Sequence, residues 1–275
     1  MNTYTKKARP GEITLYKEIL NQIADEYNKS FSILILPKLI SINTNTNTIT
    51  LPFYEGQIFN NLWDKFTAGS LLDIDLASEV PQILKDLVKV NISDIIKNKN
   101  IKNIPDIMFQ QSIYLSELDI QLRKFLDADL LKKEDAERVV ELLKKPYVST
   151  MIFNNGDFYP RNFIRSPEKK IVLIDWEIKN PHSPFYIIDY LENVAAVCFI
   201  HMWKNIPWQE KYIYELQKIL PVTKKDFQKG ILIKSLQMAD FWFKGDGKNG
   251  LCRDQLNLFK KALSEEYMNK LWGND

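Results

Sequence analysis

The sequence predicts an α+β fold: a small N-terminal sheet with one helix, followed by a mainly helical part that carries a β-hairpin. Three observations support this. Residues that favour strands are concentrated before residue 55, and apolar residues recur at helical spacing over 60–145 and 208–271. The short run 163–165, which is Phe-Ile-Arg, and the apolar run 171–174 flank a turn. We place a domain boundary near residue 55, between a reduced N-terminal part (1–55) and a helical part (56–275).

The N-terminal part contains strand candidates around one helix. A short strand over 4–8 ends in the turn Arg9-Pro10-Gly11, and apolar residues at helical spacing then extend over 12–28. The segments 31–42 and 48–54 are rich in strand-forming residues. The polar run between them, Asn-Thr-Asn-Thr-Asn, is typical of a hairpin turn.

The rest of the chain is expected to be helical, apart from the hairpin. Its apolar stripes predict core-facing helices, without reactive residues that would outweigh this interpretation. A glycine-rich stretch after residue 243 is too flexible for a helix and predicts a loop. The expected helices cover 78–90, 107–126, 132–143, 185–203 and, as three or four helices, 208–271.

Composition excludes several classes of function. The chain has 275 residues, 45% hydrophobic and 26% charged, which is typical of a soluble globular protein. Its net charge of +2 provides no overall field that favours nucleic acid or an anionic membrane. Two cysteines and two histidines give little support to a zinc cluster or a Ser-His-Asp triad. No signal-peptide core or membrane-length apolar run is present, so we expect a reducing cytoplasmic location.

The most informative stretch is 154–177. Asp157 and Asn162 lie five positions apart in a turn-rich segment, and Asp175 follows the apolar run 171–174. This arrangement suits phosphoryl transfer, because one carboxylate can accept the proton of an attacking hydroxyl while an amide oxygen and a second carboxylate hold Mg²⁺ on the nucleotide phosphates. The alternative is an Asp-Gly turn before an ordinary hairpin. Both acids, the asparagine and the hairpin spacing together favour the functional interpretation.

Residues 155–162 (Asn-Gly-Asp-Phe-Tyr-Pro-Arg-Asn) and 174–177 (Ile-Asp-Trp-Glu) resemble two motifs of the aminoglycoside phosphotransferase and choline kinase family. Those motifs typically read His-Gly-Asp-x-x-x-x-Asn and Ile-Asp-Trp/Phe-Glu. The resemblance implies a protein-kinase-like fold of two lobes, the first shortened, that uses ATP and Mg²⁺. It implies that Asp157 is the catalytic base and that Asn162 and Asp175 are the metal ligands.

The resemblance also suggests roles for neighbouring residues. Asn155 stands where the family usually has His, which we expect to affect loop packing and not phosphate chemistry. Arg161 could bind a phosphate or neutralise the catalytic base; an ordinary surface arginine is the alternative. Asp189 occupies the position of an aspartate that orients the catalytic loop, with a helix cap as the alternative. Glu177 could orient the metal ligands without binding the metal itself.

In this fold a strand lysine and a helix glutamate form an ion pair that reaches the α- and β-phosphates. Glu18 stands where the family's glutamate is expected, and its partner would be Lys6 or Lys7. The alternative is a charged, frayed N-terminus and a solvated Glu18.

The strand that ends near residue 54 resembles the hinge between the two lobes of a kinase. There the adenine ring pairs with backbone groups, here those of Pro52, Phe53 and Tyr54. Pro52 has no N–H, so only the neighbouring amides could donate.

The family's first lobe normally begins with two strands joined by a glycine-containing loop, ahead of the lysine strand. Here only five or six residues precede Lys6 and Lys7, and the first glycine is Gly11. We therefore keep two hypotheses. The first is an ATP- and Mg²⁺-dependent phosphotransferase acting on a small-molecule hydroxyl, with an aminoglycoside-, choline- or sugar-like acceptor. The second is a kinase-like binding or scaffold protein without turnover. A metal-dependent hydrolase is weaker, because no histidine or further carboxylate completes a two-metal site.

In this family the C-terminal helices line the acceptor site. Asp240, Trp242 and Asp246 are therefore candidates for binding a cationic acceptor through charge or a ring face. The alternative is that Trp242 is a core residue and the acids cap helices. The expected partners are a nucleotide and a small-molecule acceptor; neither the acceptor's identity nor the oligomeric state can be derived from the sequence.

Overall fold

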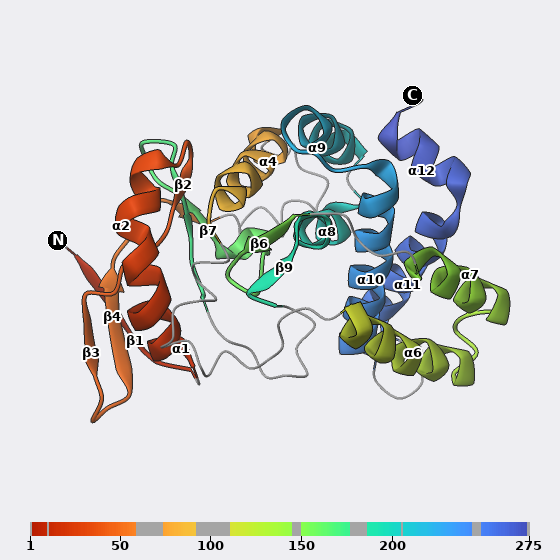
Figure 1. Cartoon of the computed structure of the whole chain (residues 1–275), viewed down its shortest axis with the longest axis horizontal. Coiled ribbons are helices and arrows are strands. Elements are labelled where there is room, and N and C mark those ends of the chain that lie inside the picture. Colours follow the sequence, from red (N-terminus) through yellow and green to blue (C-terminus); the bar gives the residue numbers. More distant parts are fainter. Residues whose placement is uncertain are drawn as a thin grey trace. The chain divides into compact units, whose positions relative to one another are not determined.

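The computed structural model describes residues 2–9, 11–58, 74–91, 111–144, 150–176, 186–204, 206–243 and 249–273 (Figure 1). Its contacts divide the chain into two compact units. Unit 1 comprises 1–108 and 151–189, and unit 2 comprises 109–150 and 190–275. This division does not coincide with the expected boundary near residue 55, because strands on both sides of that boundary share a sheet. A functional boundary at residue 55 stays a prediction.

The N-terminal sheet of unit 1 has the strand order β1-β4-β3 and is antiparallel. Strands β3 (Ser41–Asn43) and β4 (Thr48–Pro52) form the expected hairpin, and β1 (Thr3–Lys7) pairs along β4 with Lys6 opposite Ile49. Because side chains alternate along a strand, Lys6 and Lys7 point to opposite faces.

A single helical segment follows β1. It consists of α1 (Glu12–Thr14), the π-helical stretch η1 (Leu15–Leu20) and α2 (Asn21–Ser30). Gly11 precedes it with φ 75°, a left-handed conformation that favours glycine. The buried residues of this segment are Glu12, Leu15, Tyr16, Ile19, Leu20 and Ala24, and the π-helical stretch contributes four of them.

The second sheet of unit 1 has the order β2-β8-β7-β5. The hairpin expected from the sequence is present: β7 (Phe163–Arg165) pairs antiparallel with β8 (Ile171–Leu173). Strand β2 (Leu34–Ile35) runs parallel to β8, and β5 (Gln57–Ile58) pairs with β7. Residues 34–58 are therefore joined to the hairpin more than 100 positions later in the chain.

A buried carboxylate fixes the beginning of β2. Asp86, near the end of helix α4 (Ile74–Val88), accepts hydrogen bonds from the backbone N–H groups of Ser32, Ile33 and Leu34 at 2.9, 2.8 and 3.0 Å. It also pairs with Lys89 at 2.7 Å. Burial alone raises the pKa of Asp86, but these donors outweigh it and hold the pKa below its ordinary value.

The two short strands β6 (Met151–Phe153) and β9 (Ile188–Tyr190) form a separate pair. The helix expected over 185–203 is therefore shorter than predicted: α8 spans Leu191–Met202, and the residues before it form β9. The physical reason is the pairing with β6, a partner distant in sequence that local periodicity cannot reveal.

Unit 2 is helical, with α6 (Gln111–Asp127), α7 (Lys133–Leu143), α9 (Ile206–Ile219), α10 (Lys224–Trp242), α11 (Gly250–Leu263) and α12 (Glu265–Trp272) beside α8. The expected helices are present here with small shifts in their ends. Helix α10 contacts α8 closely at Gly230, where an added Cβ would lie 2.6 Å from the Glu192 carbonyl oxygen. No helix in the described part of the chain is long and apolar enough to span a membrane.

Candidate functional site

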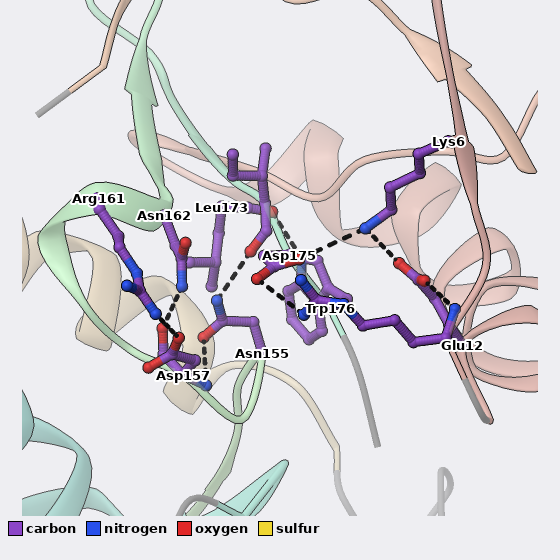
Figure 2. Close-up of polar contacts among 11 residues, drawn as sticks. Lys6, Glu12, Asn155, Asp157, Arg161, Asn162, Leu173, Asp175 and Trp176 are labelled. Carbon is purple, nitrogen blue, oxygen red and sulfur yellow. Dashed lines mark hydrogen bonds and ion pairs between the residues drawn. The ribbon is translucent and has the colours of Figure 1, made fainter. Parts of the chain in front are cut away.

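The loop after β6, residues 154–159, is held by its own asparagines. The Asn154 side chain accepts from the Gly156 N–H at 2.8 Å, and Gly156 has φ 74°. The Asn155 amide donates to the Ile174 carbonyl at 2.8 Å, while its oxygen accepts from the Asp157 N–H at 3.3 Å. Asn155 therefore links the loop that carries Asp157 to the segment that carries Asp175, a connection visible in Figure 2. The position where the resemblance expects His is thus a loop-packing position.

Asp157 and Asn162 are held together by a hydrogen bond. Both are buried, with 4% of each residue exposed. The Asn162 amide nitrogen donates to the Asp157 carbonyl at 2.8 Å, across the single turn of 3-10 helix η3 (Pro160–Asn162). Arg161, on the same turn, places its guanidinium 3.1 Å from the Asp157 carboxylate (Figure 2). Of the three interpretations of Arg161, the structure shows the contact with Asp157, made by a side chain that is 53% exposed.

Asp175 follows β8 at a strained position. Its φ is 58°, in the left-handed region that non-glycine residues rarely adopt. Two cations hold its carboxylate: Lys6 Nζ lies 3.4 Å from Oδ1, and Arg9 Nη1 lies 3.3 Å from Oδ2. The next residue, Trp176, is fully buried and donates its ring N–H to the Leu173 carbonyl at 2.6 Å. The tight turn thus orients Asp175 while its neighbour anchors the backbone.

The expected ion pair is present, but with a different glutamate. Lys6 Nζ lies 2.6 Å from Glu12 Oε1, whereas Glu18 pairs with its neighbour Lys17 at 3.1 Å (Figure 2 shows the Lys6 pair). The prediction of Glu18 as the partner is wrong, because the helix begins directly after Gly11 and brings its first residue to the end of β1. Lys7 is not the partner either, since strand alternation turns it to the other face.

A buried tyrosine interacts electrostatically with Glu12 and Asp175. Tyr16, one helical turn after Glu12, is 1% exposed. Burial raises the pKa of its hydroxyl far above the ordinary value, the carboxylates of Glu12 and Asp175 raise it further, and a hydrogen bond with the Trp176 backbone opposes them. The hydroxyl therefore remains protonated next to the site.

Asp189 is 2% exposed and lies on β9, and the N-cap residue of the following helix α8 is its neighbour Tyr190. The backbone next to β9 contacts the loop: the Asn154 N–H donates to the Ile187 carbonyl at 2.7 Å. Asp189 thus sits on a strand that flanks the loop, and its orienting role stays a prediction. Glu177 and Asp246 lie outside the described residues.

The hinge candidates lie at the end of β4, whose last residue is Pro52, and directly after it. The Phe53 N–H donates to the Asn2 carbonyl at 2.9 Å, so this amide is engaged within the N-terminal sheet. Pro52 has no N–H, which leaves the Tyr54 amide and the carbonyls of the segment to meet an adenine ring. The Phe53 ring is 51% exposed. Adenine binding at this segment stays a prediction.

Two acceptor candidates lie at the end of α10 in unit 2. Asp240 pairs with Lys124 of α6 at 2.5 Å, and Trp242 is half-buried, with its ring 5.1 Å from that of Phe241. The Lys124 ammonium also lies 4.6 Å from the centre of the Phe243 ring. Asp240 is therefore already neutralised by a lysine, and neither residue is a helix cap at the start of a helix.

The residues of unit 1 fit a magnesium ion held jointly with phosphate. A carbonyl oxygen can only accept a hydrogen bond, so the amide nitrogen of Asn162 must face the Asp157 carbonyl. The side-chain oxygen of Asn162, Oδ1, is then left as an acceptor. This oxygen has no hydrogen-bond partner in the described part of the chain. That part also contains no group of three or more His, Cys, Asp or Glu side chains that could hold a metal. One carboxylate and one amide suit Mg²⁺, which is usually held by few protein ligands together with substrate phosphates.

Neither family models nor curated proteins match this sequence, but solved structures do. A choline/ethanolamine kinase family protein from Mesorhizobium loti matches with a TM-score of 0.60 and 9% identity, over 98% of this chain and 86% of that one. The aminoglycoside phosphotransferase APH(2")-IIa bound to gentamicin matches with a TM-score of 0.54 and 12% identity, over 97% of this chain and 86% of that one. The GDP complex of aminoglycoside 2'-phosphotransferase-IIIa matches with a TM-score of 0.56 and 11% identity, over 94% of this chain and 85% of that one. The chain therefore has the protein-kinase-like fold of these small-molecule kinases, which confirms the fold predicted from its sequence.

Sequence reasoning missed Glu12, Arg9 and Tyr16. Glu12 carried a weak signal, because a glutamate directly after a turn glycine stands in the first helical turn, where acids are favoured. Arg9 and Tyr16 carried none, since their relation to Asp175 depends on how the helical segment packs against the 174–176 turn.

Proposed function

We propose that this chain is an ATP- and Mg²⁺-dependent phosphotransferase that phosphorylates a hydroxyl group of a small molecule. One observation carries the proposal. Within unit 1, buried Asp157 and Asn162 are hydrogen-bonded to each other, Asn155 links them to the Asp175 turn, and Asp175 contacts a lysine that pairs with a buried glutamate. This is the set of groups that phosphoryl transfer requires: a base, metal ligands and a phosphate-binding lysine.

In the proposed reaction, the acceptor oxygen attacks the γ-phosphorus while the bond to the β–γ bridging oxygen breaks and ADP leaves. Asp157 orients the acceptor hydroxyl and takes its proton. Arg161 contacts the Asp157 carboxylate at 3.1 Å and limits its rotation. Lys6, held by Glu12, binds phosphate oxygens. Positioning and charge neutralisation provide most of the rate enhancement in such reactions.

Asn162, through Oδ1, and Asp175 would hold the magnesium ion. When bound, Mg²⁺ neutralises phosphate charge as the transition state develops. The left-handed conformation of Asp175 supports this assignment, because strained backbone conformations are concentrated at functional sites.

The test is a calorimetric titration with ATP, with and without Mg²⁺, on the wild type, Asp175→Asn and Asp157→Ala, followed by an acceptor screen with aminoglycosides, choline-like alcohols and sugars. We expect Mg²⁺-dependent binding that Asp175→Asn loses, and binding without turnover in Asp157→Ala. No saturable binding at millimolar ATP in a folded wild type would refute the proposal.

The second candidate is a kinase-like binding protein without turnover. The engaged Phe53 amide favours it, because this group is then not offered to a purine. It predicts no turnover in the wild type, so Asp157→Ala would not change the rate of ATP consumption with any acceptor.

A further inference from the structure

Two cations share the single carboxylate that we assign to the metal. Lys6 contacts one oxygen of Asp175 and Arg9 contacts the other, at 3.4 and 3.3 Å. A carboxylate oxygen that ligates a metal must give up or weaken its contact with a cationic donor, because the two positive charges repel each other. At least one of the two side chains must therefore change partner when the site is loaded.

The two cations differ in how deeply their contacts are buried. Lys6 is bound more closely by Glu12, at 2.6 Å, and the Glu12 side chain is fully buried. This pair limits the movement of Lys6, because leaving Glu12 would strand a buried carboxylate without its cation, which is strongly unfavourable. The Arg9 side chain is 52% exposed, so solvent already screens its contact with Asp175. Breaking this contact therefore costs much less free energy than breaking the Lys6–Glu12 pair. Arg9 is therefore the cation that can change partner at the lower cost.

The backbone of Arg9 is fixed while its side chain extends toward solvent. Its N–H donates to Glu12 Oε2 at 2.9 Å, and its carbonyl accepts from the Glu12 N–H at 3.1 Å. This reciprocal pair resembles a capping box and ties Arg9 to the helix that holds Lys6 in place. The guanidinium therefore starts from a defined point next to the phosphate-binding lysine. Its planar set of donors matches phosphate oxygens better than a lysine ammonium does.

We propose that Arg9 is a polyphosphate-binding residue: it holds Asp175 in the ligand-free protein and moves to a phosphate oxygen when a metal–nucleoside triphosphate binds. This inference rests on the proposed function and adds to it a second phosphate-binding cation from the turn after β1. Its ligand class is a nucleoside di- or triphosphate, as distinct from the nucleoside alone.

The experiment compares the affinities of wild type and variants for Mg²⁺–ATP, Mg²⁺–ADP and adenosine, using calorimetry for the nucleotides and ligand-observed NMR for adenosine. The variants are Arg9→Ala and Arg9→Lys, with Arg9→Gln as a longer neutral replacement if alanine disturbs folding. Arg123→Ala is the matched control, because Arg123 is also an exposed arginine paired with one aspartate, Asp119, at 2.7 Å. Circular dichroism verifies the fold of each variant.

We expect Arg9→Ala and Arg9→Gln to weaken ATP and ADP binding by about 10- to 100-fold, the loss of one charge-assisted contact, and to leave adenosine binding unchanged. Arg9→Lys should recover part of the loss, and Arg123→Ala should bind like the wild type.

Three results would overturn the inference. Unchanged ATP affinity in Arg9→Ala would remove Arg9 from the site while the proposed function stands. Tighter binding in Arg9→Ala would show that Arg9 only competes with the metal for Asp175. Absence of Mg²⁺–nucleotide binding in the wild type itself would refute the proposed function and the role of Arg9 with it.

Discussion

The choice of Glu12 over Glu18 as the partner of Lys6 can be tested by replacing each with alanine. Glu12 has a fully buried side chain, which pairs with Lys6 at 2.6 Å and accepts the Arg9 N–H at 2.9 Å. Removing one partner of a buried ion pair typically costs about 3–5 kcal/mol. Lys6 is 18% exposed and keeps its contact with Asp175, so we expect a cost at or just below the low end of this scale, about 2–3 kcal/mol for Glu12→Ala.

Glu18→Ala is the matched control, on the same helical segment. Its side chain is 21% exposed and its partner Lys17 is 63% exposed, so the pair behaves as a surface ion pair. Such pairs contribute about 0–1 kcal/mol. The two variants remove the same side chain type at positions six residues apart.

The assays are thermal unfolding and calorimetric titration with Mg²⁺–ATP. We expect Glu12→Ala to lower the melting temperature by several degrees and to weaken nucleotide binding, because Lys6 loses the group that positions it. Glu18→Ala should leave both properties within error of the wild type. Equal effects of the two variants, or loss of binding only in Glu18→Ala, would refute the assignment.

Three further predictions concern stability. Asp86→Asn should lower the free energy of unfolding by about 2–4 kcal/mol at pH 7, since three backbone donors lose a buried carboxylate. The folded-state pKa of Asp86 is depressed, so its contribution is present above the unfolded-state pKa and is lost as the pH falls through the folded-state pKa; denaturant titrations of both proteins from pH 7 to pH 3 should show their difference shrinking. Gly230→Ala should cost about 2–4 kcal/mol in the same assay, because its Cβ would lie 2.6 Å from a backbone oxygen, whereas Gly250→Ala, with no atom within 4 Å, should be neutral or slightly stabilising. Tyr16→Phe should cost about 1 kcal/mol through the lost hydrogen bond with the Trp176 backbone, and equal melting temperatures of the two proteins would contradict this.

The parts of the fold that the sequence predicted are those set by local pattern. The β7–β8 hairpin follows from two apolar runs around a polar turn, and the β3–β4 hairpin from strand formers around a run of Asn and Thr. The hydrogen bond between Asp157 and Asn162 is likewise local, because their five-residue spacing is closed by one turn of helix. Such features depend on neighbours in the chain, which the sequence displays directly.

The sequence misled, or left alternatives open, where the outcome depends on a distant partner or on the face to which a strand residue points. Local pattern predicts that Ile188–Tyr190 begins an apolar helix. In the structure this segment is instead strand β9, which pairs with β6, more than 30 residues earlier in the chain. Lys6 rather than Lys7 faces Glu12 because of its register with Ile49 on β4. In each case the deciding contact is non-local.

All the residues that we assign to the nucleotide and the metal belong to unit 1, while Asp240 and Trp242, the described acceptor candidates, belong to unit 2. The two parts of the proposed activity are therefore separable by substitution. The carboxylate of Asp240 is paired with Lys124, so a cationic acceptor would have to compete with that lysine. Asp240→Asn should then change the Michaelis constant for the acceptor and leave the dissociation constant for Mg²⁺–ATP unaltered. If nucleotide affinity instead fell together with acceptor affinity, Asp240 would act on unit 1 through the fold, and its assignment to the acceptor would be wrong.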